Sequence, residues 1–243
     1  MEWYDDGIVL TARKHGESSA IVTLLTREHG RHAGLVRGGM GRRKRGLFQP
    51  GNRVRATWRA RLAEHLGSYT CEMTAAVAAP FMNDRLRLAG LSAICAVAEA
   101  ALPERERFEP VYEGMGILLD VLDQNIWPTI YVKWEMGLLQ ELGFGLDLTC
   151  CVATGVTENL NYVSPKSARA VSADAAEPFK HALLRLPGFL IDTGQTASWP
   201  DIADGLRLTG FFLDRQVFAH TRECQAPAAR GRLVDLIRNE ASV

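Results

Sequence analysis

The residues whose chemistry stands out lie in a short loop where four consecutive cations are flanked by glycine. Residues 37–46 read RGGMGRRKRG. Closely spaced cations neutralise phosphates and release counterions, and glycine leaves backbone N–H groups accessible. The loop lacks the G-x-x-x-x-G-K-S/T spacing of a Walker A motif. The pattern therefore indicates binding to a polyanion through charge, with a solvated loop that has no ligand as the alternative.

A second basic segment, residues 53–61, reads RVRATWRAR and alternates in polarity. On a strand, alternate residues lie on opposite faces, so the arginines share the outer face and Trp58 falls on the inner face. We expect Trp58 to belong to the core, with Phe48 and Tyr69 as weaker candidates for stacking a base. The candidate phosphate-binding residues are Arg37, Arg42, Arg43, Lys44, Arg45, Arg53, Arg55, Arg59 and Arg61.

Charge is distributed unevenly along the chain. The 243 residues carry 28 Lys/Arg and 28 Asp/Glu and are 47% hydrophobic, which excludes a disordered chain and a disulfide-dense mini-protein. Residues 1–79 hold 13 basic and 7 acidic side chains, net +6, and residues 80–243 hold 15 and 21, net −6. We therefore expect a basic part that binds a polyanion and an acidic part that makes protein contacts.

Secondary-structure patterns divide the chain at the same place. The first part contains short β-branched or alternating runs separated by turn residues, which predict a small antiparallel barrel. The remainder has apolar residues at helical spacing. The sequence thus predicts an α+β protein with a barrel in residues 1–79 and a helical domain in residues 80–243. The expected strands are Gly7–Arg13, Ala20–Thr26, His32–Val36, Val54–Arg61 and Leu66–Met73.

Within the helical part, residues 145–172 lack a helical period and indicate an irregular insert, with a hairpin as one option. Ser198 and Asp201 are placed to form a capping box for the helix that follows them. The expected helices lie near residues 91–102, 111–122, 130–142, 178–186 and 201–220 and around residues 233–237.

The compartment is suggested by what the sequence lacks. The acidic residues Glu2, Asp5 and Asp6 are unlike the start of a signal peptide, and the uncharged stretch Leu88–Ala98 is too short to span a bilayer. Five cysteines without framework spacing are typical of free thiols in a reducing cytoplasm. We expect a cytoplasmic protein with no membrane contact.

Several motifs resemble, in the same order along nearly the whole chain, those of the bacterial recombination mediator RecO family. The matching segments are GIVL at 7–10, GE at 16–17, LLTREHG at 24–30, the basic loop, QPG at 49–51, LQELGFGLDL at 139–148 and YVSPKS at 162–167.

The resemblance implies an N-terminal OB-fold, a helical C-terminal domain, no catalytic site and no cofactor. It implies binding of single- and double-stranded DNA and annealing of strands coated by the single-strand binding protein SSB. With RecR, such a protein assists RecA loading in the RecF pathway, in association with the nucleoid. The helical domain would hold the acidic C-terminal tail of SSB, and candidates for a cationic rim are Lys133, Arg207 and Arg215.

The sequence departs from the family at a zinc site. Many members hold a four-cysteine zinc in the insert, and the corresponding positions here are Cys151, Thr154, Ser172 and Ala175. A structural zinc needs four thiolate or imidazole ligands, and Cys150 is too close in sequence to complete the set. We predict no bound metal. The insert would instead be held by apolar contacts of Leu160, Tyr162 and Val171.

Two alternatives remain at this point: a Mg²⁺-dependent nuclease that acts on branched DNA, and an RNA-binding OB module. A nuclease needs clustered carboxylates near the basic segment. The candidates are Glu17, Glu28 and Glu64, near the histidines His15, His29, His32 and His65. Their spacings match no ligand pattern, so we expect ordinary surface and turn residues.

Overall fold

The computed structural model describes residues 1–41, 44–192, 194–221 and 224–242. The chain forms two compact units. The first comprises Met1–Leu122 with Pro227–Arg230, and the second comprises Asp123–Ala226 with Gly231–Val243.

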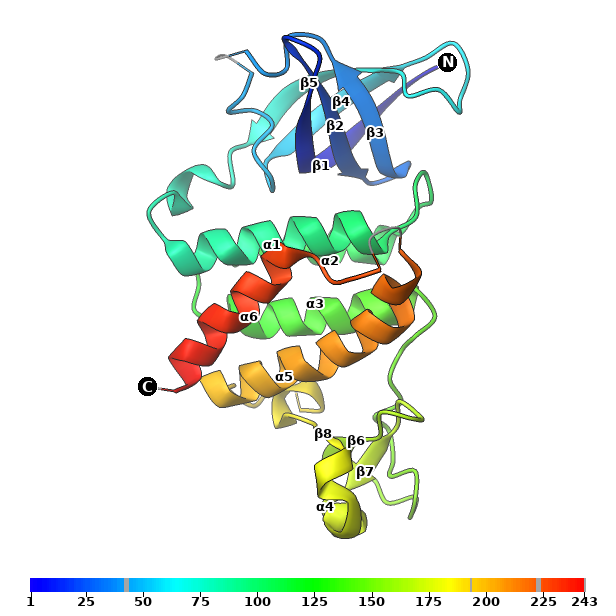
Figure 1. Ribbon diagram of the computed structural model, residues 1–243, viewed down its shortest axis with the longest axis vertical. Helices are drawn as coiled ribbons and strands as arrows, with labels where there is room; N and C mark the ends of the chain where they lie inside the picture. The colour runs from blue at the N-terminus through cyan, green and yellow to red at the C-terminus, as the bar shows by residue number, and fades with distance from the viewer. Residues whose placement is uncertain (42–43, 193, 222–223, 243) are drawn as a thin grey trace. The chain divides into compact units, whose positions relative to one another are not determined.

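The first unit begins with a closed five-stranded barrel (Figure 1). Its strands follow the order β1-β2-β3-β5-β4, and β1 closes the barrel by pairing with β4. All neighbours are antiparallel except β3 and β5, which meet in parallel at one residue pair. This is the five-stranded OB arrangement, which confirms the expected fold class. The strands are β1 (Glu2–His15), β2 (Ser19–Thr26), β3 (Gly30–Val36), β4 (Arg53–Arg59) and β5 (Ser68–Ala75).

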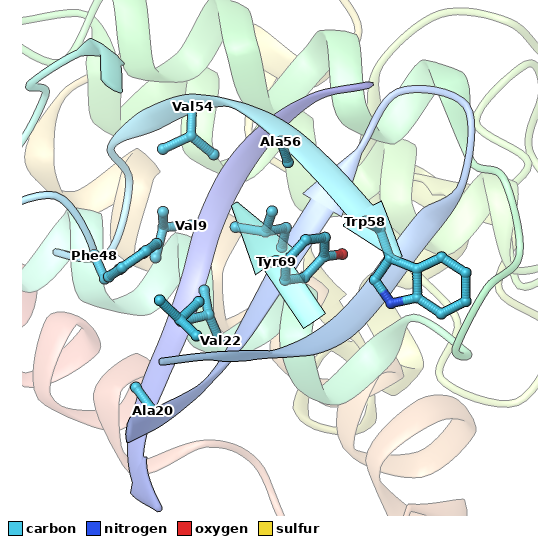
Figure 2. Close-up of a cluster of buried hydrophobic side chains, with 10 residues drawn as sticks. Val9, Ala20, Val22, Phe48, Val54, Ala56, Trp58 and Tyr69 are labelled. Atoms are coloured by element: carbon cyan, nitrogen blue, oxygen red, sulfur yellow. The ribbon is translucent and has the colours of Figure 1, made fainter. Parts of the chain in front are cut away.

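Alternation along the strands fills the barrel with apolar side chains. Val54, Ala56 and Trp58 of β4 point inward, whereas the intervening residues are exposed or half-buried. Figure 2 shows these side chains with Val9, Val22 and others in the barrel interior. Trp58 is 2% exposed and its indole Nε1 donates to the Leu66 carbonyl at 3.0 Å, which confirms that it belongs to the core.

Helices α1 (Arg85–Ala101) and α2 (Glu109–Asp120) belong to the same compact unit as the barrel. The side chain of Asp84 caps α1 by accepting from the Arg87 N–H at 2.9 Å. Cys95 of α1 donates its thiol proton to the Val9 carbonyl of β1 across 3.6 Å. The boundary expected after residue 79 therefore marks the change from strands to helices, and independent folding of residues 1–79 stays a prediction.

The segment between these helices binds one end of the barrel. The Arg105 guanidinium donates to the carbonyl groups of residues 63–65, which lie in the loop between β4 and β5. The Arg105 N–H donates to the Arg31 carbonyl at 2.8 Å, and the Arg31 Nε donates to the Leu102 carbonyl at 2.6 Å. Charge-assisted bonds of this kind are stronger than neutral ones, so the segment holds the β3 edge and the loop together.

The second unit is built on two packed helices. Gly205 of α5 lies so close to Val132 of α3 that a Cβ there would be 2.9 Å from the Val132 Cγ1. Thr209 donates to the buried carboxylate of Glu135 at 2.5 Å. Its elements are α3 (Trp127–Glu141), β6 (Leu160–Val163), β7 (Ala170–Ser172), α4 (Ala173–Ala176), β8 (Leu184–Arg185), α5 (Trp199–Phe212) and most of α6 (Ala228–Ala241), with short turns at Glu177–Ala182, Gly188–Leu190, Leu213–Val217 and Phe218–His220. A further short turn, Ala79–Phe81, lies in the first unit.

Two of the three local expectations for this region are confirmed. The capping box forms, because the Ser198 hydroxyl accepts from the Asp201 N–H and the Asp201 carboxylate accepts from the Ser198 N–H. The insert does contain a hairpin, β6 paired with β7. The helix expected at residues 178–186 is wrong. A short 3-10 turn ends at Ala182, and Leu184 then pairs with Val163 because the edge of β6 offers it backbone hydrogen bonds.

Among the helices that the structure describes, none is both long enough and apolar enough to cross a bilayer.

Replacing Gly30 should destabilise the protein strongly. Gly30 has a φ of +62°, and a Cβ there would lie 1.8 Å from the Glu106 carbonyl oxygen. We expect Gly30→Ala to lower the free energy of unfolding by roughly 2 kcal/mol or more, because backbone strain adds to a backbone clash. Gly16 has a φ of +63° with nothing near its Cβ position, so Gly16→Ala carries the strain alone. Urea unfolding gives the free energy of unfolding of both variants, and the larger loss in Gly30→Ala measures the clash with Glu106. Equal losses in the two variants would contradict a contribution from that clash.

His32 should make folding stability depend on pH. Burial lowers the pKa of His32 to about 4, and the positive charge of Arg105 adds to this effect. Between pH 6.5 and pH 4 the unfolded chain then binds more protons than the folded one, so stability falls as the pH falls through that window. We expect a loss of roughly 2 kcal/mol between about pH 7 and pH 5 from this residue.

The test compares urea unfolding of the natural chain with that of His32→Asn at both pH values. Asparagine keeps a polar atom near the Tyr69 hydroxyl, which lies 3.1 Å from the His32 Nδ1. The variant should lose less stability on acidification, while His15→Asn, at an exposed position, should behave like the natural chain. Equal pH dependence in all three proteins would refute the assignment.

Candidate nucleic-acid interface

The basic loop follows β3 directly and is held by backbone hydrogen bonds. The Met40 N–H donates to the Ser18 carbonyl at 3.1 Å, and the Lys44 N–H donates to the Gly41 carbonyl at 2.9 Å. The Lys44 ammonium donates to the Arg37 carbonyl at 3.2 Å, which draws two of the predicted cations together. Arg37, Lys44 and Arg45 are exposed. Arg42 and Arg43 lie outside the described residues.

The arginines of β4 share the outer face of the barrel, as the alternation predicts, but they are paired with carboxylates. Arg59 contacts Glu2 at 2.7 Å and Arg55 contacts Asp6 at 3.4 Å. Each pair consists of direct cross-strand neighbours in the β1–β4 ladder. These pairs are not among the expectations from the sequence. The two carboxylates and the two arginines share a four-residue spacing, which is compatible with the pairing but does not fix the register between the strands.

Arg53 serves a different contact. It donates to the Gly116 carbonyl and to the Asp120 carboxylate, both at 2.8 Å, and so joins β4 to α2 within the first unit. Two further barrel arginines pair with the same two helices: Arg13 with Glu99 of α1, and Arg27 with Glu113 of α2. The side of the barrel next to these helices therefore has its positive charge largely compensated.

The exposed pairs of β4 are still exchangeable. The hydrogen bond from Arg59 lowers the pKa of Glu2, and the hydrogen bond from Tyr4 does so as well, so this carboxylate stays ionised. Exposed ion pairs contribute little to stability, so breaking one costs little free energy. A phosphate that binds Arg55 or Arg59 must nevertheless first displace the carboxylate that is already there. Among the residues that the structure describes, no carboxylate pairs with Arg37, Lys44, Arg45 or Arg61.

The two weaker candidates for base stacking, Phe48 and Tyr69, are each only 5% exposed. Figure 2 shows both within the buried cluster. They are therefore not open platforms on the barrel surface.

The residues predicted to surround an acidic peptide tail lie in the second unit, on α3, on α5 and on the turn that follows α5. Lys133 is half-buried on α3, and Arg207 is exposed on α5. Arg215 is exposed on the turn that follows α5, with its guanidinium 5.3 Å from the centre of the Phe211 ring. The rim for an acidic tail stays a prediction.

Of the histidines and glutamates considered for a nuclease, His29, His32 and Glu28 have structural partners, and His15, Glu17, Glu64 and His65 are exposed. His29 contacts the buried Asp5 carboxylate at 2.9 Å and stacks on Trp3 at 4.0 Å. His32 is buried in the barrel, so the expectation of a surface or turn residue is wrong for this histidine, and Glu28 pairs with Arg107 at 3.3 Å. Across the described part of the chain, no three His, Cys, Asp or Glu side chains converge in a way that could hold a metal ion.

Three of the four positions that correspond to zinc ligands, Cys151, Thr154 and Ser172, are joined by hydrogen bonds in the insert. The Ser172 hydroxyl donates to the Cys151 Sγ at 3.4 Å. Burial raises the pKa of the Cys151 thiol, but hydrogen bonds from Ser172 and Thr154 outweigh it and bring the pKa to about 6. Of the apolar residues expected to hold the insert, Leu160 and Val171 are buried and Tyr162 is half-buried.

Restoring the missing ligands should create a zinc site. Two sulfurs of a tetrahedral zinc lie roughly 3.8 Å apart, given Zn–S bonds of about 2.3 Å, and the 3.4 Å between Cys151 and Ser172 is close to this spacing. We expect Thr154→Cys/Ser172→Cys/Ala175→Cys to bind one zinc per chain and to unfold at a higher temperature with zinc than with a chelator. Elemental analysis measures the metal. Stoichiometric zinc in the natural chain would contradict the prediction of a metal-free insert.

Comparison with known proteins assigns both parts of the chain. Residues 1–76 match the family described as "Recombination protein O N terminal", and residues 82–223 match "Recombination protein O C terminal". A protein named DNA repair protein RecO from Rhodospirillum centenum is 53% identical, over 98% of this chain and 95% of that protein. Proteins of the same name from Rhodospirillum rubrum and Afipia carboxidovorans are 48% and 49% identical, over at least 98% of this chain and 97% and 99% of those proteins. The chain therefore belongs to the RecO family of DNA repair and recombination proteins.

Proposed function

We propose that the chain binds DNA through the phosphate backbone, without sequence preference, and anneals complementary strands coated by SSB. The observation that carries this is the exposed cluster of Arg37, Lys44 and Arg45, which has no carboxylate partner among the described residues. Family membership supports a role in DNA repair. The protein then acts as a mediator rather than as an enzyme.

Annealing follows from the charge on the loop. Two DNA strands repel each other through their phosphates, and cations that neutralise both backbones lower that repulsion. Contacts to phosphate carry no sequence information and leave the base edges free to pair. A loop that projects cations from a compact barrel can meet two strands while the barrel itself stays folded.

The nine predicted DNA-binding residues are not equivalent in this proposal. The loop residues and Arg61 make the first phosphate contacts, because no carboxylate has to be displaced from the described members of this group. Arg55 and Arg59 contribute after their ion pairs with Asp6 and Glu2 open. Arg53 acts mainly within the protein, where it joins β4 to α2.

The acidic remainder of the chain would serve protein contacts. Residues 80–243 carry 15 basic and 21 acidic side chains, so this part repels DNA and leaves its surface available to proteins. Lys133, Arg207 and Arg215 would form the rim for the acidic tail of SSB. Cooperation with RecR in RecA loading, in the RecF pathway and at the nucleoid, completes the proposed role.

Removing two loop cations should weaken DNA binding more than removing two paired arginines. We expect Lys44→Ala/Arg45→Ala to lower the affinity for single-stranded DNA and to reduce the slope of log affinity against log salt by about 1.4, which is the effect of two lost phosphate contacts. Arg55→Ala/Arg59→Ala changes the net charge equally and serves as the matched control. Its slope should change less. The slopes are measured by fluorescence anisotropy across a salt series.

If both double variants lose the same affinity and slope, general charge rather than the loop directs binding. If neither changes, the proposed interface is wrong. Annealing of SSB-coated complementary strands by the natural chain tests the mediator role itself.

A further inference from the structure

The weakest contact in the barrel lies beside the basic loop. Strands β3 and β5 meet in parallel at the single pair Leu35–Ser68, where the Leu35 N–H donates to the Gly67 carbonyl at 3.0 Å. Among the described residues this is their one backbone pair, with the Tyr69 hydroxyl of β5 also bonded to His32 of β3. A pocket of about 450 Å³ opens between β3, β5 and the loop. That volume falls within the range of pockets that bind small organic groups.

The lining of this pocket combines apolar walls with a cationic rim. Leu35, Leu47 and Phe48 supply apolar surface, and Arg37 and Lys44 supply the positive charge. The pocket has no acidic residue among its described lining residues. The Lys44 ammonium is held near the rim by its bond to the Arg37 carbonyl.

The charge of Lys44 also reaches the interior of the pocket. Burial raises the pKa of the Cys71 thiol to about 12, and the ammonium of Lys44 acts in the opposite direction. Cys71 itself is half-buried and lines the pocket. A space with both apolar and polar walls and a cation at its mouth suits a flat group that has polar edges and carries a negative charge on one side.

A nucleotide has this form, with an aromatic base joined through a sugar to a phosphate. We infer that the pocket takes one unstacked base of single-stranded DNA while Lys44 and Arg37 hold the adjacent phosphate. The inference rests on the proposed DNA binding and adds to it a preference for single strands. A duplex keeps its bases paired and stacked, so it can contact the rim but cannot fill the pocket.

Substitutions at the mouth of the pocket test this. Ser68 and Thr70 line the pocket and are exposed on β5, and Thr74 is exposed on the same strand outside it. A tryptophan at either of the first two positions should obstruct entry of a base. We expect Thr70→Trp and Ser68→Trp to lower the affinity for an unstructured oligonucleotide roughly fivefold or more, the value of one lost base contact, with duplex affinity unchanged. Thr74→Trp should bind both DNAs like the natural chain.

A second measurement avoids substitutions altogether. Methyl methanethiosulfonate modifies accessible thiols, and mass spectrometry of the peptide containing Cys71 gives its rate of modification. Saturating single-stranded oligonucleotide should slow this rate several-fold, and saturating duplex should not.

The outcomes separate the two proposals. If the natural chain binds neither DNA, the proposed DNA-binding function is wrong and this inference falls with it. If the natural chain binds single strands but both pocket variants bind them equally well, or Cys71 is not protected, the pocket is not a base site and the phosphate-binding function stands.

Discussion

The double pairing of strand β1 is the constraint on which the rest of the barrel depends. This 14-residue strand pairs with β2 through its second half and with β4 through its first half, and the second pairing closes the sheet. Closure fixes the register between β1 and β4, and the register places Glu2 opposite Arg59 and Asp6 opposite Arg55. The same step that buries Trp58 therefore also commits its neighbouring arginines to carboxylates.

Ion pairs with carboxylates of the first unit thus determine which cations remain free to contact phosphate. Acidic residues of α1 and α2 pair with Arg13, Arg27 and Arg53, and β1 pairs with Arg55 and Arg59. The loop after β3 has no such partner among the described residues, so its described cations, Arg37, Lys44 and Arg45, remain available. The net charge of residues 1–79 is a poor guide to the interface, because much of it is compensated within the fold.

Local patterns in the sequence predicted what depends on neighbours along the chain. The alternation around Trp58 identified the inner and outer faces of β4, and the Ser198–Asp201 spacing identified the capping box, because both are set within a few residues. The carboxylate partners of Arg55 and Arg59 depend on a register between strands about fifty residues apart, which no local pattern encodes. The segment near Leu184 has a helical pattern in the sequence, but it forms a strand because it pairs with β6, and this pairing is also not encoded locally. The pocket arises from the way β3 and β5 meet, and it too is a tertiary feature.

The single bridge between β3 and β5 has a mechanical consequence for the barrel. Every other seam is held by a ladder of at least seven paired positions, so opening one of those seams breaks many hydrogen bonds together. Between β3 and β5 a single backbone pair is supplemented by the Tyr69 hydroxyl, which bonds to His32, and by Arg105, which bonds to Arg31 and to the loop after β4. Cooperative units in proteins open first where few bonds hold them, and this seam has the fewest backbone pairs to break, so its side-chain bonds carry much of its closure. If β3 and β5 separate at this seam, the four antiparallel ladders of the barrel can keep their register.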